Sequence, residues 1–205
     1  MKNRALILVD LQNDFMPDGA LPVPEGYDVI EVANALQSRF DLVVATQDWH
    51  PPDHRSFASN HPGKQPGDVV DLEGLEQILW PDHCVQDTRG AEFVRGLELD
   101  HVARVFQKGT DPFIDSYSGF SDNGHRKSTG LDEYLRDHGV DTVYVAGVAT
   151  DYCVKYTALD ALRQGFDTWV VRDGCRAVNL APGDDDRAFA EMRSAGAHIV
   201  DRDDV

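Results

Sequence analysis

Val143–Val154, with the sequence VYVAGVATDYCV, is the stretch from which the fold can be worked out. Its first four residues are apolar and predict a buried strand, and residues 152–164 have the apolar spacing of a helix. Thr150 can cap this helix with its hydroxyl. Cys153 would then lie in the first turn, where the helix dipole favours an anion, so we expect an acidic, nucleophilic thiol. A cysteine that only packs at a helix start is the alternative.

Short apolar runs of the same kind recur along the chain, and segments with helical spacing alternate with them. This alternation predicts an α/β fold in which a parallel sheet is flanked by helices and joined by right-handed crossovers. We expect six strands, at Ala5–Val9, Leu42–Ala45, Val102–Phe106, Val143–Ala146, Thr168–Val171 and Ala197–Val200. We expect helices near residues 29–39, 131–138, 152–164 and 187–194. Residues 51–88 are rich in Pro, Gly, Asp and His and predict a long functional loop.

The composition narrows the class of protein. A chain of 205 residues with 41% hydrophobic residues suits one domain over residues 1–205. The formal charge of −17 argues against a nucleic-acid partner, because no basic patch can neutralise phosphates. No apolar run reaches the length of a membrane span. The three cysteines are far apart and do not suggest a disulfide framework, so we expect a protein of the reducing cytoplasm.

Polar side chains follow four of the predicted strands. In a parallel sheet, ligands bind beyond the carboxyl ends of the strands, so Asp10, Asp48, Lys108 and Cys153 should meet in one crevice. A carboxylate such as Asp10 can take the thiol proton and later give it to a leaving amine. An ammonium such as Lys108 stabilises both a carboxylate and a thiolate. Taken singly, each residue is also common as a structural carboxylate or a surface lysine, but their shared position favours catalysis.

A second cluster has the composition of a metal site. Asp48 and His50 alternate in an extended segment and therefore point to the same side, while a loop can return His83 to them. One carboxylate and two imidazoles suit zinc, manganese or ferrous iron, with positions left for water and substrate. Ser56 and His54 follow closely in the sequence, and the role of His54 is left open.

Aromatic side chains occur in the same loops. Phe15, Trp80 and Tyr117 would sandwich a flat aromatic substrate, or else cover the core beneath a long loop. The Gly-x-Gly-x-x-Gly fingerprint is missing after the first predicted strand, which argues against an oxidoreductase with a nicotinamide cofactor. A non-catalytic zinc-binding protein with an inert cysteine is a further alternative, and the reactivity of Cys153 relative to Cys84 and Cys175 would distinguish it.

Taken together, these motifs resemble the nicotinamidase/pyrazinamidase family of isochorismatase-like hydrolases. The resemblance extends over nearly the whole chain, in order, and rests on Val9–Phe15 (VDLQNDF), Gln47–Pro51 (QDWHP), Ser56-Phe57, Trp80–Val85 (WPDHCV), Lys108-Gly109, Asp115–Phe120 (DSYSGF) and Gly147–Val154 (GVATDYCV). It implies a three-layer sandwich whose six-stranded parallel sheet has the order 3-2-1-4-5-6. It also implies a cis peptide bond between Val148 and Ala149.

The same resemblance implies an activity. A metal-dependent amidohydrolase would convert nicotinamide to nicotinate and ammonia, and pyrazinamide to pyrazinoate, through a cysteine thioester in NAD salvage. Cys153 would be the nucleophile, Asp10 the general base and then acid, and Lys108 their electrostatic partner. The backbone amides of Ala149 and Cys153 would hold the oxyanion. An isochorismatase would lack the cysteine and an N-carbamoyl amidase the metal cluster, so both are poorer matches.

The resemblance also implies a cofactor and a binding pocket. One divalent metal ion, with zinc the first expectation and iron or manganese the alternatives, would bind Asp48, His50 and His83. Ser56 would contribute through its hydroxyl or a water, since some relatives have a histidine or glutamate at the aligned position. The pyridine ring of the substrate would stack among Phe15, Trp80 and Tyr117. The expected partner is this small molecule, with no nucleic acid or membrane, for a chain that is a monomer or a homo-oligomer.

Overall fold

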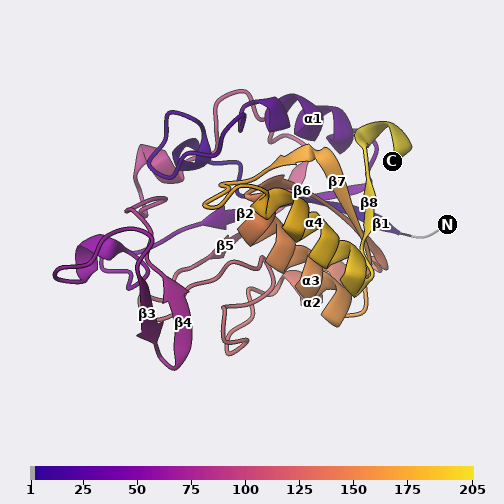
Figure 1. The fold of residues 1–205 in the computed structure, drawn as a ribbon. Helices are drawn as coiled ribbons and strands as arrows, with labels where there is room; N and C mark the ends of the chain where they lie inside the picture. Colours follow the sequence, from indigo (N-terminus) through magenta and orange to yellow (C-terminus); the bar gives the residue numbers. More distant parts are fainter. Residues whose placement is uncertain (1–2) are drawn as a thin grey trace.

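Six strands form one parallel sheet in the computed structural model, which describes residues 3–205 (Figure 1). The order β5-β2-β1-β6-β7-β8, counted within this sheet alone, is the expected 3-2-1-4-5-6, and every neighbouring pair is parallel. The strands are β1 Arg4–Val9, β2 Leu42–Asp48, β5 Val102–Lys108, β6 Thr142–Val148, β7 Asp167–Arg176 and β8 His198–Val200.

Helices cover both faces of the sheet, as the three-layer prediction requires. In Figure 1, α1 lies over one face, and α2, α3 and α4 lie over the other. The α-helices are α1 Asp28–Gln37, α2 Leu131–Asp137, α3 Lys155–Arg163 and α4 Asp184–Ala195. Short 3-10 helices are η1 Asn13–Phe15, η2 Ala58–Asn60, η3 Arg89–Ala91 and η5 Arg202–Asp204.

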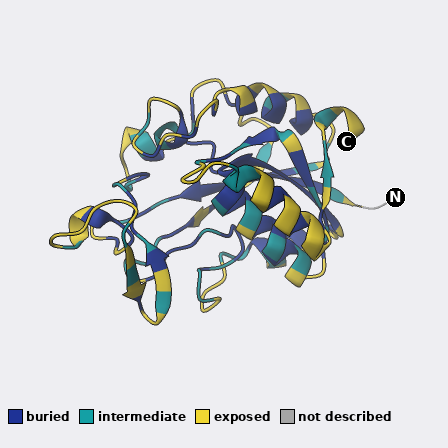
Figure 2. Ribbon diagram, in the orientation of Figure 1, coloured by how far each residue is buried: buried dark blue, intermediate teal, exposed yellow. Residues whose placement is uncertain are grey.

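The hydrophobic core is divided by the sheet into two clusters. Along β1, Leu6 and Leu8 pack with α1, whereas Ala5, Ile7 and Val9 pack against the three helices of the opposite face. Both faces of a central parallel strand are therefore buried, which explains why β1 is apolar without alternation. Figure 2 shows the same pattern, with a buried sheet between helices that are exposed on their outer sides.

Four strands extend beyond their predicted C-terminal ends. β2 continues to Asp48, β5 to Lys108, β6 to Val148 and β7 to Arg176. Apolar runs mark only the part of a strand that packs in the core, whereas the backbone ladder also continues through polar residues. Asp48 and Lys108 are still paired in register as Cα partners, so the last ladder positions of β2 and β5 fix two polar side chains side by side.

The long loop predicted over residues 51–88 contains a β-hairpin. β3 (Val69–Leu72) and β4 (Leu75–Ile78) pair in antiparallel fashion and project away from the sheet (Figure 1). They are joined by Glu73 and Gly74, which both have positive φ, at 53° and 84°. A two-residue turn with this geometry matches the right-handed twist of the flanking strands.

The segment after β6 differs in detail from its prediction. Thr150–Val154 forms one π-helical turn, η4, which leads directly into α3. Thr150 does not cap the helix: the cap position is Ala149, no side chain bonds there, and Thr150 is itself buried inside the turn. The Val148–Ala149 peptide bond is cis, as the resemblance implied. A Cβ on Gly147 would lie 2.1 Å from Val9 O, so only glycine lets β6 approach the end of β1 this closely.

None of the helices within residues 3–205 combines the length and the apolar character needed to cross a membrane.

Candidate active site

Four strand ends deliver the predicted polar residues to one edge of the sheet. Asp10 follows β1, Asp48 and Lys108 end β2 and β5, and Cys153 lies in the turn after β6. All four are buried, with exposed fractions of 0%, 4%, 2% and 6% respectively. The four side chains therefore lie together at one edge of the sheet, as predicted.

The Lys108 ammonium lies at the centre of this group. Its Nζ is 2.9 Å from Asp10 Oδ2 and 3.3 Å from Cys153 Sγ, and it also donates to Asp48 Oδ1. A fourth contact, to the Ser116 carbonyl at 2.9 Å, fixes the direction of the side chain. One buried cation thus holds a thiol and two carboxylates within reach of one another.

Burial governs the protonation of the thiol. It raises the pKa of Cys153 well above its ordinary value, while the Lys108 ammonium acts in the opposite direction and the Asp10 carboxylate adds to the rise. This direction is opposite to the acidic thiol expected from the helix start, because desolvation outweighs the neighbouring cation. The resting sulfur carries a proton, so the nucleophile needs a base beside it.

Asp10 has the properties of that base. Burial raises the pKa of its carboxyl group against the lowering effect of Lys108, which makes the ionised form a stronger base than an ordinary carboxylate. Asp10 Oδ1 accepts a hydrogen bond from Thr46 Oγ1 at 2.7 Å, which orients the group. Asp48 differs: despite its burial, the charges of Lys108 and His50 hold its pKa far below the usual range.

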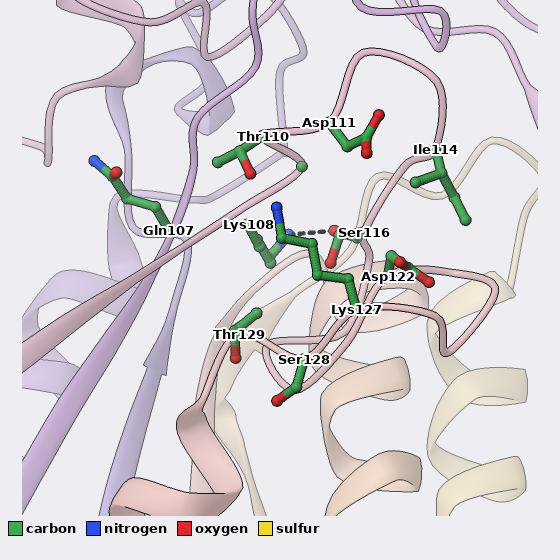
Figure 3. Close-up of a pocket in the computed structure, with 11 residues that line it drawn as sticks. Gln107, Lys108, Thr110, Asp111, Ile114, Ser116, Asp122, Lys127, Ser128 and Thr129 are labelled. Carbon is green, nitrogen blue, oxygen red and sulfur yellow. Dashed lines mark hydrogen bonds between the residues drawn. The ribbon is translucent and has the colours of Figure 1, made fainter.

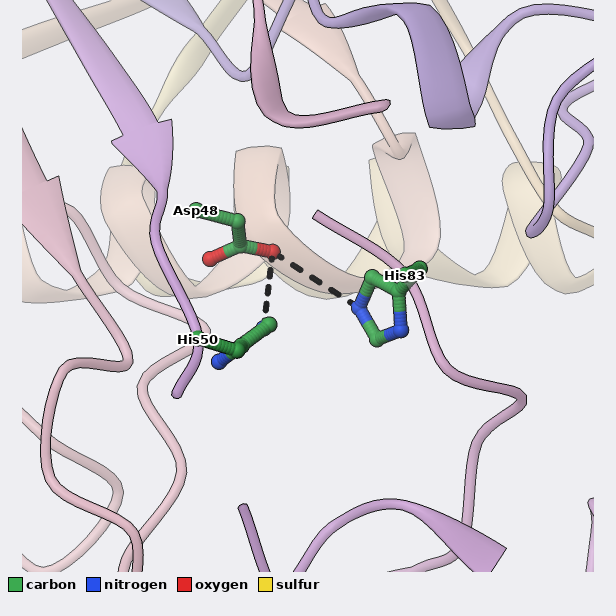
Figure 4. Close-up of side chains that lie close together, drawn as sticks. All are labelled: Asp48, His50 and His83. Carbon is green, nitrogen blue, oxygen red and sulfur yellow. Dashed lines mark ion pairs between the residues drawn. The ribbon is translucent and has the colours of Figure 1, made fainter. Parts of the chain in front are cut away.

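Asp48, His50 and His83 form a cluster with the donor atoms of a metal site (Figure 4). Their ligand atoms lie within 4.8 Å of one another, with Asp48 Oδ2 at 3.6 Å from His50 Nε2 and 3.9 Å from His83 Nε2. The other ring nitrogens bond carbonyl groups: His50 Nδ1 to Gly109 at 2.9 Å, and His83 Nδ1 to Pro81 at 2.8 Å.

These carbonyl contacts fix the tautomers of the two rings. A carbonyl oxygen only accepts, so Nδ1 of His50 and of His83 carries a proton, and Nε2 is the nitrogen that faces Asp48 and can bind a metal ion. Two imidazoles and one carboxylate with this orientation fit a divalent metal ion. A Cβ at Gly109 would lie 2.3 Å from His50 Cε1, so glycine is required for this ring position.

Ser56 and His54 lie beside the cluster and contact each other. Ser56 Oγ is 2.7 Å from His54 Nδ1, and the His54 ring centroid is 4.4 Å from that of His50. Burial lowers the pKa of His54 to about 4, so the ring is neutral. Within residues 3–205 no hydrogen-bond partner reaches His54 Nε2. A role for Ser56 in metal binding stays a prediction.

A pocket of about 350 Å³ opens onto the thiol. Phe15, Trp80 and Tyr117 all line it, so the structure brings the three predicted aromatic residues together. Trp80 Nε1 donates to the Tyr117 hydroxyl at 3.1 Å, which holds two of these rings in place. The remaining lining residues are Leu21, Asp48, His83, Asp115, Ala149, Tyr152, Cys153 and Val178. A flat aromatic molecule in this pocket would contact both the sulfur and the metal-ligand cluster.

Comparison with known proteins agrees with this geometry. A family model described as the isochorismatase domain matches residues 4–204. The chain belongs to the isochorismatase family. It is 54% identical over 203 residues to the nicotinamidase of Escherichia coli strain K12, covering 97% of this chain and 95% of that protein.

Solved structures of the isochorismatase family support the same assignment. The nicotinamidase/pyrazinamidase of Acinetobacter baumanii superposes with a TM-score of 0.96 at 45% identity, covering 100% of this chain and 98% of that one. The pyrazinamidase of Pyrococcus horikoshii, solved in complex with zinc, superposes with a TM-score of 0.79 at 44% identity, covering 97% and 99%.

Two polar residues of this isochorismatase-family site were not predicted from the sequence. Gln77, on β4, donates from Nε2 to Asp115 Oδ2 at 3.1 Å and to the Tyr117 hydroxyl at 3.0 Å. The Glu73-Gly74 pair, placed between two short segments that each end in apolar residues, is the signal that would have predicted the hairpin and thus Gln77. Asp115 lies within a quoted motif, but no spacing rule marks it as a pocket residue.

A second pocket, of about 340 Å³, is lined in part by Lys108 (Figure 3). Most of the residues that line it are polar, among them Thr110, Asp111 and Lys127. It has no aromatic residue and no cysteine in its lining, and Lys108 is the one predicted site residue among those that line it. The pocket on the Cys153 side is therefore the better candidate for an isochorismatase-family substrate site.

Proposed function

We propose that this chain is a metal-dependent amidohydrolase that converts nicotinamide to nicotinate and ammonia in NAD salvage, and pyrazinamide to pyrazinoate. The observation that carries the proposal is the contact of Lys108 Nζ with Asp10, Asp48 and Cys153 Sγ at the wall of an aromatic pocket. Its similarity over nearly the full length to the nicotinamidases described above supports the choice of substrate.

In the first half of the proposed reaction, Cys153 Sγ attacks the carboxamide carbon while its proton passes to Asp10. The oxyanion that forms accepts hydrogen bonds from the backbone amides of Ala149 and Cys153. Asp10 then returns the proton to the amine nitrogen, the C–N bond breaks, and ammonia leaves a thioester on the sulfur. Lys108 stabilises the negative charge that moves between thiol and carboxylate.

In the second half, water attacks the thioester carbon and gives a proton to Asp10. The C–S bond breaks, nicotinate is released, and the sulfur regains its proton. Phe15, Trp80 and Tyr117 hold the pyridine ring through both halves, which limits the entropy lost at each step.

Asp48, His50 and His83 would hold the divalent metal ion, with Ser56 contributing directly or through water. Such an ion, when bound, supplies Lewis-acid attraction for a ring nitrogen or an oxygen at the pocket wall. Zinc is the first expectation, supported by the zinc complex of the Pyrococcus horikoshii pyrazinamidase. The contribution of the chain is to aim Nε2 of both imidazoles at the site, through the carbonyls of Gly109 and Pro81.

We also propose that residues 1–205 act as one domain in the cytoplasm, as a monomer or homo-oligomer with a small-molecule substrate. The charge of −17 supports the absence of a nucleic-acid partner, because like charges repel phosphate. No membrane partner is proposed either.

Ammonia release from nicotinamide by the metal-loaded protein tests the proposed function. We expect turnover that Cys153→Ala abolishes, and that Cys175→Ala, which removes another buried thiol, leaves intact. Activity of Cys153→Ala equal to that of the unchanged chain would end the assignment of the nucleophile. Absence of ammonia from the unchanged, metal-loaded chain would contradict the proposed substrate.

A further inference from the structure

Three buried histidines lie around the metal-ligand cluster, and their hydrogen bonds divide them into two kinds. His50 and His83 each place Nδ1 against a backbone carbonyl, which leaves Nε2 as the nitrogen available to a metal ion. His54 is the opposite case. Its Nδ1 accepts a hydrogen bond from the backbone N–H of Ser56 at 3.2 Å, and the Ser56 hydroxyl lies 2.7 Å from the same nitrogen.

A backbone N–H only donates, so His54 Nδ1 must carry a lone pair and the ring proton must be on Nε2. His54 Nε2 is therefore a donor and has no lone pair to offer a metal ion. It is fully buried, and among residues 3–205 it has no hydrogen-bond partner. A buried N–H without an acceptor is costly, so the site calls for an acceptor at this position.

Asp115 provides the complementary group. Its carboxylate accepts hydrogen bonds from the Ser116 amide at 2.7 Å and from Gln77 at 3.1 Å, and it lines the aromatic pocket. One ring nitrogen of His54, one of His50 and one oxygen of Asp115 lie within 4.8 Å of one another. One water bridging two polar atoms spans about 4.5 Å, so a water fits between a donor and an acceptor at this separation.

We propose that His54 and Asp115 form a water-binding subsite beside the metal ligands, and that His54 is a hydrogen-bond donor rather than a metal ligand. The water accepts a hydrogen bond from His54 Nε2–H and donates one to Asp115. One proton and one lone pair of the water then remain for groups in the pocket or for the ion. The subsite rests on the metal site of the proposed function and leaves the ligands proposed there unchanged.

Histidine ring NMR on the unchanged protein tests the tautomers. With ¹⁵N-labelled histidine, we expect His54 to show a protonated Nε2 and a bare Nδ1 in the metal-free protein and after loading with ¹¹³Cd²⁺. Coupling between cadmium and ring nitrogen should appear at His50 and His83 and be absent at His54. Coupling at His54, or a proton on its Nδ1, would overturn the proposal. Failure to bind any cadmium would contradict the metal site itself, while the metal-free spectrum would still decide the tautomer.

Two variants test the shared water. His54→Ala and Asp115→Asn should each weaken cadmium binding by about 10- to 100-fold, the range for groups that orient metal-bound ligands. Because both hold the same water, the double variant should be no weaker than the weaker single variant. Asp111→Asn removes a carboxylate of the same loop that accepts a hydrogen bond from the Phe113 amide at 3.0 Å, and it should leave affinity unchanged. Additive losses, or no loss in either single variant, would overturn the subsite.

Discussion

Replacement of Lys108 by methionine would remove the central cation and nearly preserve the length of the side chain. Asp10 and Asp48 are 0% and 4% exposed and would then lie together without a positive charge in the metal-free protein. Removing one partner of a buried ion pair costs about 3–5 kcal/mol. Domains are stable by about 5–15 kcal/mol, so we expect a folded protein that has lost a large part of its free energy of unfolding.

Urea unfolding with a chelator present, followed by circular dichroism, measures this loss. Lys155→Met is the matched control, because Lys155 pairs with the exposed Glu191 at 3.3 Å and should contribute less than about 1 kcal/mol. Adding Asp10→Asn to Lys108→Met should restore about 0.5–3 kcal/mol, the usual coupling between contacting residues. Equal losses for Lys108→Met and Lys155→Met would refute the reasoning.

Three further outcomes are expected. Burial raises the pKa of Asp10 above 3.8, and only the ionised carboxylate accepts the thiol proton. We therefore expect kcat/KM for nicotinamide to fall as pH falls through this pKa. A value of kcat/KM that stays unchanged down to pH 3.8 would contradict this role. Chelation should abolish ammonia release, and adding back zinc, iron or manganese should rank the candidate metals; full activity after chelation would exclude a metal requirement. Tyr117→Phe leaves the buried Trp80 Nε1 without its acceptor and should cost about 1–3 kcal/mol of unfolding free energy and raise KM; unchanged values would show that the contact is unimportant.

Much of the fold follows from the sequence because a parallel sheet buries both faces of its strands. The runs at Ala5–Val9 and Val143–Ala146 are apolar throughout, which marks them as central strands. The residue at which a strand ends is harder to predict from the sequence. Asp48 and Lys108 were expected after their strands, yet both remain in the ladder, because backbone pairing does not depend on side-chain polarity.

Only those active-site residues that come directly after a strand, or lie within one of the motifs quoted above, could be predicted from the sequence. The rule for parallel sheets was sufficient to bring Asp10, Lys108 and Cys153 together. Protonation states were not predictable, because the desolvation that raises the pKa of Cys153 depends on packing from distant segments. Likewise, the tautomer of His54 depends on a single backbone amide two residues along the chain, which no composition or spacing rule reveals.

A single-turnover experiment with excess enzyme and nicotinamide, quenched in acid and analysed by peptide mass spectrometry, tests the central claim directly. The account predicts one nicotinoyl group on the peptide that contains Cys153, appearing with ammonia and decaying to nicotinate, and none on Cys84 or Cys175. Ammonia release with no adduct on Cys153 at any time during the turnover would contradict it.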